Sequence, residues 1–176
     1  MEHWAMEPEV LKSYARHVET NQPIPDELIE KLKASQTFNQ GFSTTEYLAA
    51  CYLDMAWHKE AGAGDSAVDN FEQAAMDKIG KIGMVDPRYK SSYFQHIFTG
   101  DHYSAGYYVY MWAEVLDADG YEAFRERGIF DAETAKSFRE NILEKGGTVD
   151  PMALYKTFRG REPEVQPLLK NRGLLA

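Results

Sequence analysis

The sequence predicts an all-α protein, a bundle of about seven or eight helices. Apolar residues recur at spacings of three and four along most of the chain, and no stretch of useful length alternates apolar and polar residues as a strand does. Pro, Gly and Asp also stand where the periodic runs begin and end. With 176 residues, of which 44% are hydrophobic and 27% charged, the chain can bury a substantial core. We therefore expect one helical domain.

In the N-terminal half, three helices are expected. Pro8 opens the first, over residues 8–18, and a second carries the apolar residues within 28–32. Residues 47–57 are apolar on nearly every side, and residues 43–46 in front of them have the pattern of a capping box. They predict a central buried helix that ends at the glycine-containing segment 61–64.

In the C-terminal half, the pattern continues. A helix over 68–79 should stop at Gly80, and a short helix should precede Thr99. Residues 99–103 are expected to form a loop, and residues 105–116 an aromatic-rich helix. Two further helices follow, one capped by Asp131 and ending before Gly146, the other capped by Asp150, with Pro151 as its first residue and Gly160 at its end.

The charge and the cysteine count exclude several classes of protein. The net charge is −9, and the 19 basic residues are scattered among 28 acidic ones, which disfavours nucleic acid or an anionic membrane as a partner. Cys51 is the sole cysteine, so no disulfide can form within the chain, and a reducing compartment is expected. No apolar run approaches the roughly 18 residues of a membrane span. We expect a soluble protein, cytoplasmic or else periplasmic.

The most distinctive segment is 93–112, which contains five of the 11 tyrosines. Phenol hydroxyls can donate hydrogen bonds to developing negative charge. Tyr103, Tyr107 and Tyr110 stand at i, i+4 and i+7, so they would share a face if a helix began near Tyr103. Packing in the core is the commoner explanation of such a stripe. The residues alone leave both interpretations open.

Few other residues or motifs in the sequence could carry catalytic chemistry. His96 and His102 could supply protons, although a single histidine near a loop is more often structural. The zinc signature H-E-x-x-H is missing, as are the phosphate-binding glycine motifs and the G-x-S-x-G elbow. Cys51 lies inside an apolar run, where a thiol behaves as a small hydrophobe. A self-contained enzyme of these classes is therefore not expected.

Segment 93–112 and the residues after it resemble the substrate-binding loop and following helix of the thimet-oligopeptidase-like (M3 family) zinc metallopeptidases. Within these, the sequence most resembles the bacterial peptidyl-dipeptidases, also named dipeptidyl carboxypeptidases. The resemblance covers the whole chain. Further segments match the family in order, namely Glu2–Trp4, Pro25–Leu28, Phe38–Gly41, Leu53–His58, Phe158–Pro163 and Asn171–Leu174.

The resemblance implies roles for six residues. Tyr110 corresponds to the tyrosine whose hydroxyl stabilises the oxyanion when zinc-bound water attacks the scissile carbonyl. His96 corresponds to a histidine that binds the substrate backbone, and Tyr103 and Tyr107 to tyrosines that hold the C-terminal side of the peptide. Gly100, together with Gly106, would let the loop close. Many relatives have consecutive glycines near Gly100, and the loop here is about one residue longer than in some; His102 receives no role.

The resemblance also implies that the zinc ligands lie upstream of this sequence. We therefore expect the C-terminal segment, about a quarter, of a helical catalytic domain, with residues 1–176 carrying the substrate-binding loop but binding no metal. The whole enzyme would use zinc to hydrolyse short peptides and release C-terminal dipeptides, whereas this chain alone would be inactive. Self-association is a further expectation, through the apolar surface that would face the missing metal-bearing part.

Alternatives remain. The enzyme could cleave internal bonds of short peptides as an oligopeptidase. The chain could instead be a helical interaction module that uses the aromatic cluster as a partner surface, or a stand-alone protein that binds a small polar ligand.

Overall fold

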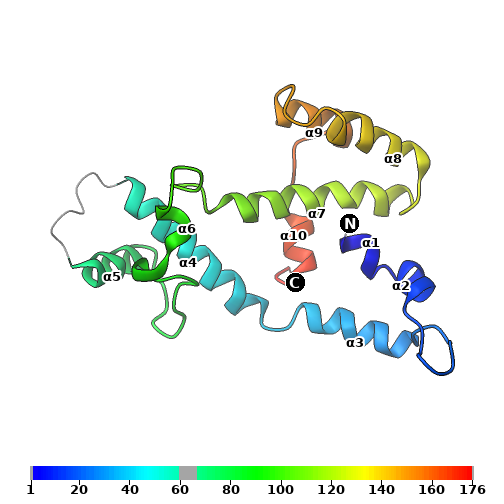
Figure 1. The fold of residues 1–176 in the computed structure, drawn as a ribbon, viewed down its shortest axis with the longest axis horizontal. Helices are drawn as coiled ribbons and strands as arrows, with labels where there is room; N and C mark the ends of the chain where they lie inside the picture. Colours follow the sequence, from blue (N-terminus) through cyan, green and yellow to red (C-terminus); the bar gives the residue numbers. More distant parts are fainter. Residues whose placement is uncertain (1, 60–66, 176) are drawn as a thin grey trace. The chain divides into compact units, whose positions relative to one another are not determined.

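The structure is a computed structural model, which describes residues 2–59 and 67–175. The predicted all-α class is confirmed: the described residues form ten α-helices and no β-strand (Figure 1). Arg16 and Pro23 form an isolated antiparallel bridge. None of the described helices is long and apolar enough to cross a membrane. The helices are α1 (Glu2–Met6), α2 (Pro8–Tyr14), α3 (Asp26–Gln36), α4 (Gln40–Lys59), α5 (Val68–Lys78), α6 (Gln95–Phe98), α7 (Val109–Arg127), α8 (Ala132–Phe138), α9 (Pro151–Arg159) and α10 (Gln166–Asn171).

The chain divides into two compact units. Unit 2 is the continuous segment Asn39–Ala113, and unit 1 combines the residues up to Phe38 with those from Glu114 onward. The expectation that residues 1–176 belong to one catalytic domain stays a prediction.

Unit 2 is built on the contact between α4 and α5. Ala49 and Leu53 on α4 pack against Ala75 and Met76 on α5, and Leu53 is completely buried. Full burial of a leucine side chain contributes roughly 2 kcal/mol. Trp57 packs against the same cluster, and its indole nitrogen donates to Ser91 Oγ at 2.9 Å. This packing fixes α4 as the support for the segments that follow α5.

The start of α4 corrects the sequence prediction. The helix begins at Gln40, so Ser43 lies inside it and the capping box at residues 43–46 is wrong. The cause is Asn39, whose φ of 57° is not helical and whose carbonyl accepts the Ser43 N–H, so the helix begins directly after it. The prediction that α4 is buried on nearly all sides is also too strong, because Tyr52 is exposed. Its predicted end, at residues 61–64, lies outside the described residues.

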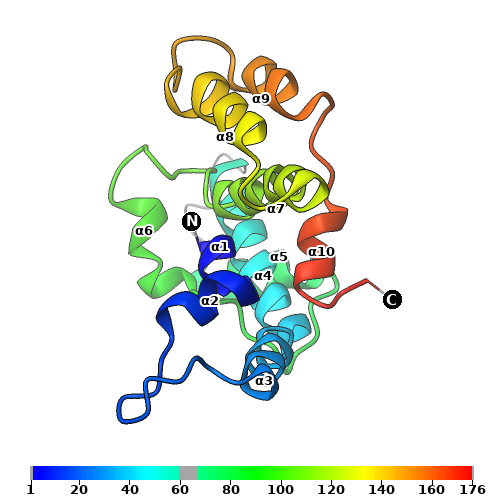
Figure 2. The same cartoon turned by 90° about the vertical axis from the view of Figure 1, so that its right-hand side faces the viewer.

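Unit 1 gathers helices around the C-terminal part of α7. Tyr121 and Phe124 on α7 are buried, and the Trp4 ring meets both edge-on, with centroid distances of 4.6 and 4.7 Å. Phe138 connects Phe124 with Phe158 of α9. In Figures 1 and 2, α8 and α9 run side by side; the π-helical turn η2 (Arg139–Leu143) contacts both. These aromatic contacts hold the N-terminal and C-terminal segments in one core.

Buried charge also stabilises unit 1. Asp119 is fully buried on α7, and its carboxylate accepts hydrogen bonds from Tyr155 at 2.5 Å and from Arg161 at 2.5 Å. Arg159 lies 3.6 Å from the same carboxylate. Burial and the hydrogen bond to Asp119 raise the pKa of Tyr155, so this phenol stays a donor. A charge buried this deeply is tolerated because it is paired.

Several helix boundaries match the sequence prediction because they are decided locally. Asp131 accepts the Thr134 N–H at 2.7 Å, and Asp150 accepts the Ala153 N–H at 2.8 Å, as caps do. Gly160, with φ of 81°, ends α9, and Gly80, with φ of 64°, follows α5.

Other boundaries differ from the prediction. The first helix ends at Tyr14 rather than residue 18, because the chain turns back through the bridge of Arg16 with Pro23. The aromatic-rich helix continues to Arg127 rather than residue 116. The helix behind Asp131 ends at Phe138 and passes into η2. The short helices α1 and α10 were not predicted.

Candidate functional site

The tyrosine segment forms a tight loop between α6 and α7. The predicted short helix before Thr99 is present as α6, and the residues after it turn without regular helix. The predicted start of the next helix at residue 105 is wrong, because Ala105 has a φ of 56° and α7 begins only at Val109. Tyr103 and Tyr107 therefore reach Tyr110 from a loop, and not from one helix face.

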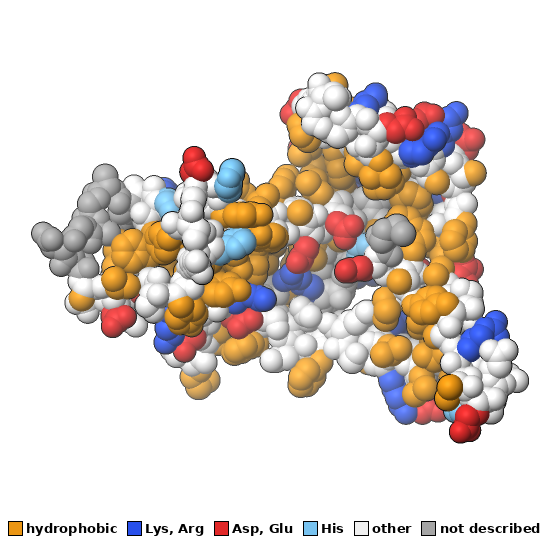
Figure 3. All heavy atoms as spheres, in the orientation of Figure 1, with side chains coloured by type: hydrophobic (Ala, Val, Ile, Leu, Met, Phe, Trp, Pro, Cys, Tyr) orange, Lys and Arg blue, Asp and Glu red, His pale blue; other side chains and the backbone are white. Residues whose placement is uncertain are grey.

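The loop nevertheless brings four of the predicted site residues together, since the Tyr107 ring lies 5.8 Å from that of His96 and 5.5 Å from that of Tyr110. His96 Nε2 lies 3.0 Å from the Tyr110 hydroxyl, a hydrogen bond whose donor depends on the imidazole tautomer. The rings of His96 and Tyr103 are 4.3 Å apart, and those of Tyr103 and Tyr110 stack at 5.7 Å. Figure 3 shows histidine and hydrophobic side chains gathered over the part of unit 2 that carries α6. The cluster therefore presents an imidazole beside two phenols.

Tyr110 is a suitable hydrogen-bond donor in this cluster. Its side chain is 38% exposed, so its hydroxyl is within reach of solvent or a ligand. A hydrogen bond with Tyr103 is the main cause that raises the pKa of Tyr110 above its ordinary value. The phenol therefore stays protonated at neutral pH and can donate to an anionic oxygen.

Tyr107 occupies a different environment. Its side chain is 6% exposed and packs with Cys51, Phe94 and Ile97 in a core cluster. Burial raises its pKa to about 12. The Tyr107 ring also stacks on Tyr47 at 5.2 Å. In this structure Tyr107 serves as core, and its implied contact with substrate stays a prediction.

The glycines and His102 lie at the tip and base of the loop. Gly100 and His102 are exposed, and Ser104 Oγ donates to the carbonyls of Ile97 at 3.2 Å and Gly100 at 3.1 Å. A side chain at Gly106 would lie 3.4 Å from the Tyr103 backbone. That distance is an ordinary van der Waals contact, so the turn does not require glycine at position 106, and the closing motion implied for the two glycines stays a prediction.

The sequence analysis missed the residue that anchors this loop. Asp54 on α4 is fully buried, and its two carboxylate oxygens accept the N–H groups of Ala105 at 2.9 Å and Tyr107 at 2.8 Å. His58 Nδ1 lies 2.8 Å from Asp54 Oδ1. Hydrogen bonds to a charged acceptor are worth about 1.5–3 kcal/mol each. Two of them outweigh the roughly 1–2 kcal/mol cost of the left-handed backbone at Ala105.

A signal for Asp54 was present in the sequence. It is the one acidic residue in the apolar run 47–57, and an acid on a buried helix needs partners. Tyr47, also on α4, adds a second attachment by donating its hydroxyl hydrogen to the Tyr107 carbonyl at 2.8 Å. Both backbone polar groups of Tyr107, its N–H and its carbonyl, therefore bind side chains of α4.

Within the described residues, no group of three or more His, Cys, Asp or Glu side chains stands close enough to hold a metal ion. Residues 2–59 and 67–175 therefore do not fit a zinc centre of their own. Burial raises the pKa of the Cys51 thiol to about 11, so this thiol is a poor metal ligand and a poor nucleophile at neutral pH.

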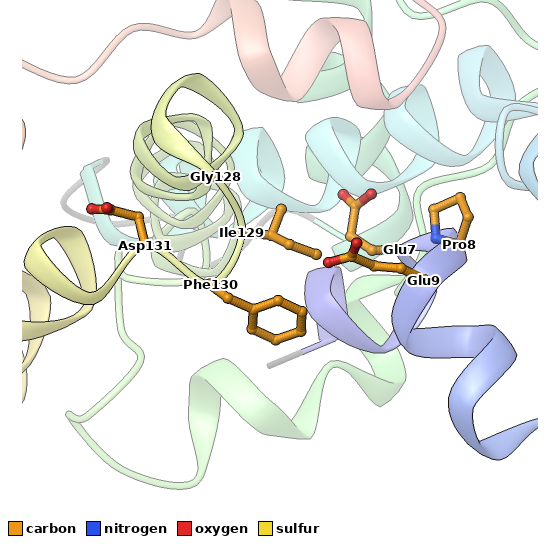
Figure 4. A pocket seen from close by; sticks show the side chains of 7 residues that line it. All are labelled: Glu7, Pro8, Glu9, Gly128, Ile129, Phe130 and Asp131. Carbon is orange, nitrogen blue, oxygen red and sulfur yellow. The ribbon is translucent and has the colours of Figure 1, made fainter.

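Unit 1 contains a separate hollow of about 560 Å³. Figure 4 shows Glu7, Glu9 and Ile129 turned toward one another, whereas Asp131 points away, where it caps α8. Phe130 lines the same hollow and is exposed. None of the predicted site residues belongs to it.

Comparison with known proteins agrees with the resemblance. The family model described as Peptidase family M3 matches residues 1–174. The chain is 43% identical, over 98% of its length, to the dipeptidyl carboxypeptidases of Salmonella typhimurium and Escherichia coli. It is 40% identical, over 99% of its length, to oligopeptidase A of Escherichia coli. In each case it spans 26% of the relative. The chain belongs to peptidase family M3.

Proposed function

We propose that this chain is the part of a zinc metallopeptidase that binds the peptide and stabilises the transition state. The observation that carries the proposal is the cluster of His96, Tyr103 and Tyr110, in which an exposed neutral phenol stands beside an imidazole at 3.0 Å. Family membership supports zinc and a peptide substrate. The metal ligands would come from sequence outside this chain.

In this proposal each residue of the cluster has its own task. Tyr110 donates a hydrogen bond to the oxyanion that forms as the scissile carbonyl becomes tetrahedral. A phenol is suited to this task because it donates without carrying a charge. His96 hydrogen-bonds the substrate backbone near the scissile bond, and Tyr103 and Tyr107 hold the C-terminal side of the peptide. Gly100, at the exposed tip, lets the loop move between open and closed positions, whereas Gly106 lies between the two residues that Asp54 holds.

We further propose that the complete enzyme releases dipeptides from free C-termini. Support comes from the 43% identity to two proteins named dipeptidyl carboxypeptidase. Internal cleavage of short peptides is the second candidate, supported by the 40% identity to oligopeptidase A. A peptide blocked by a C-terminal amide separates the two: dipeptide release should fail on it, whereas internal cleavage should continue. The compartment we propose is the cytoplasm, with the periplasm as the alternative.

Two measurements test the proposal. The reading frame upstream of this segment should encode H-E-x-x-H, and its absence would remove the assignment to a complete zinc peptidase. The 176-residue chain itself, prepared with zinc and then dialysed, should retain no stoichiometric metal and should not hydrolyse peptides. Tight zinc binding together with peptidase activity in this chain would contradict the proposed division of the active site.

A further inference from the structure

We infer that Asp54 is a positioning residue for the substrate loop, and that its carboxylate sets the backbone turn that brings Tyr103 and Tyr110 together at His96. This inference rests on the proposed function. Asp54 does not touch the substrate in it, and acts through the peptide groups of Ala105 and Tyr107.

The turn at residues 105–107 has a geometry that suits a bound anion. The N–H groups of Ala105 and Tyr107, residues i and i+2, point at the two oxygens of one carboxylate at distances of 2.9 and 2.8 Å. N–H groups of nearby residues point to one side of the backbone when a residue in the turn has a left-handed conformation. Such a concave group of N–H donors, called a nest, binds anions. Ala105 is that residue, with φ of 56°. Asp54 is thus a built-in anion that selects a conformation which alanine disfavours.

The turn is held from a single helix, α4. Asp54 and Tyr47 both lie on α4, and Tyr47 holds the Tyr107 carbonyl at 2.8 Å while Asp54 holds the Tyr107 N–H. A site held from a helix is more precisely placed than one held only from loops. The loop tip around Gly100 and His102 is exposed, whereas Tyr107 is buried. The loop is therefore held at its base, while its tip is exposed.

The Asp54 side chain is itself held in place by His58. His58 Nδ1 stands 2.8 Å from Asp54 Oδ1 and 2.9 Å from the Asp54 carbonyl oxygen. Both neighbours are acceptors, so Nδ1 carries a proton and donates it to them. An imidazole that donates to a carboxylate fixes that carboxylate, as partners outside the reacting atoms do in other sites. His58 thereby keeps both Asp54 oxygens aligned with the two N–H groups.

The test is Asp54→Asn in the full-length peptidase. The amide nitrogen cannot accept a hydrogen bond, so one of the two N–H groups loses its partner. We expect kcat/KM to fall by about 10-fold to 100-fold, since a displacement of about 1 Å at reacting groups costs up to 10²-fold. Zinc content should be unchanged. The matched control is Glu72→Gln, because Glu72 also accepts a loop N–H in unit 2, that of Ser91 at 2.7 Å, and kcat/KM should stay within about twofold.

A rescue separates positioning from simple stability. Glycine adopts the left-handed conformation without the penalty of a Cβ. Adding Ala105→Gly to Asp54→Asn should recover part of the lost kcat/KM, whereas the same change should do little in the parent enzyme. If Asp54 only stabilised α4, Ala105→Gly would give no recovery. Equal losses in the Asp54 and Glu72 variants, or no recovery with glycine, would overturn the inference.

A last measurement needs no variant. The amide hydrogens of Ala105 and Tyr107 in the unmodified enzyme should exchange with solvent far more slowly than those of Asp101 and His102 at the exposed tip. Equal exchange rates would overturn the inference even if Asp54→Asn did not fold. An enzyme that shows slow exchange at both positions but cleaves no peptide would contradict the proposed function, and would leave the role of Asp54 in shaping the loop intact.

Discussion

His96 and Tyr110 stand 14 residues apart in the chain and share a hydrogen bond of 3.0 Å at the mouth of the tyrosine loop. The imidazole comes from α6 and the phenol from the first turn of α7, so the loop between them sets the distance. Both groups can donate or accept, and Tyr110 is exposed. The pair can therefore exchange its internal hydrogen bond for hydrogen bonds to a peptide.

Replacement of Tyr110 by Phe in the full-length enzyme should lower kcat by roughly 10²–10³, the usual cost of removing one oxyanion donor. Zinc affinity should change little, because the phenol is not a metal ligand in the proposal. Steady-state kinetics and metal analysis check both values. Tyr108→Phe is the matched control, since Tyr108 is exposed and two residues away, and it should keep its activity. Unchanged turnover in Tyr110→Phe would remove the oxyanion assignment.

Loss of the Asp119 carboxylate should destabilise unit 1. In Asp119→Ala, Arg161 and Arg159 lose the buried anion with which they pair, at 2.5 and 3.6 Å. Breaking a buried pair on one side costs about 3–5 kcal/mol. Urea unfolding should show the midpoint falling accordingly. Glu162→Ala, which removes an exposed partner of Lys156, should leave the midpoint nearly unchanged, and equal effects from the two variants would contradict this account.

Alkaline pH should weaken the core of unit 2. The pKa of Cys51 is about 11 in the folded chain against 9.0 for the free thiol, so the thiol ionises first in the unfolded state. The unfolded chain then holds fewer protons than the folded one, and the free energy of unfolding falls as the pH rises from about 9 to 11. Urea titrations at pH 8 and pH 10.5 measure the drop.

The control for this prediction is Cys51→Ala. It removes the thiol, so the fall in stability between the two pH values should become smaller, although Tyr107, with a pKa of about 12, still contributes at the upper end. An identical fall in the parent chain and the variant would show that Cys51 is not responsible.

The 176-residue chain should self-associate at high concentration. Leu28 and Leu32 on α3 are exposed, although they were predicted to be on the apolar face of an amphipathic helix, and Ile29 is the buried residue there. Exposed apolar groups one turn apart favour association. Light scattering should show mass rising with concentration, and the double change Leu28→Glu with Leu32→Glu should reduce it. Val18→Glu is the control, and a strictly monomeric parent chain would contradict the prediction.

The sequence predicts those parts of the fold that neighbouring residues decide. Asp131 and Asp150 cap their helices through N–H groups three residues ahead, and Gly160 ends α9 through its own φ. Each of these interactions lies within one turn of helix, so a local pattern suffices. The helical class follows from many such patterns together.

The error at the start of α7 lies where a distant residue decides the backbone. Ala105 is a good helix former, yet it adopts a left-handed conformation because Asp54, 51 residues earlier, binds its N–H. The family resemblance supplied the candidate residues of the site, and the spacing of tyrosines did not predict how they meet. Tyr107 shows the limit most clearly, since a stripe at helical spacing cannot distinguish a phenol that faces solvent from one buried against Phe94.

The make-up of unit 1 has a consequence for synthesis of the chain. The indole N–H of Trp4 donates to the Ile129 carbonyl at 2.7 Å. Gly173 packs so closely on Thr37 that a Cβ at Gly173 would lie 3.0 Å from the Thr37 Cβ. Unit 1 therefore joins residues from both ends of the sequence. Unit 2 lies between them as one continuous segment. Contacts of long sequence separation form slowly, and domains fold as the ribosome releases them. Asn39–Ala113, which carries the tyrosine loop, can therefore fold while the ribosome is still adding α8, α9 and α10, whereas unit 1 must wait until α10 has been made.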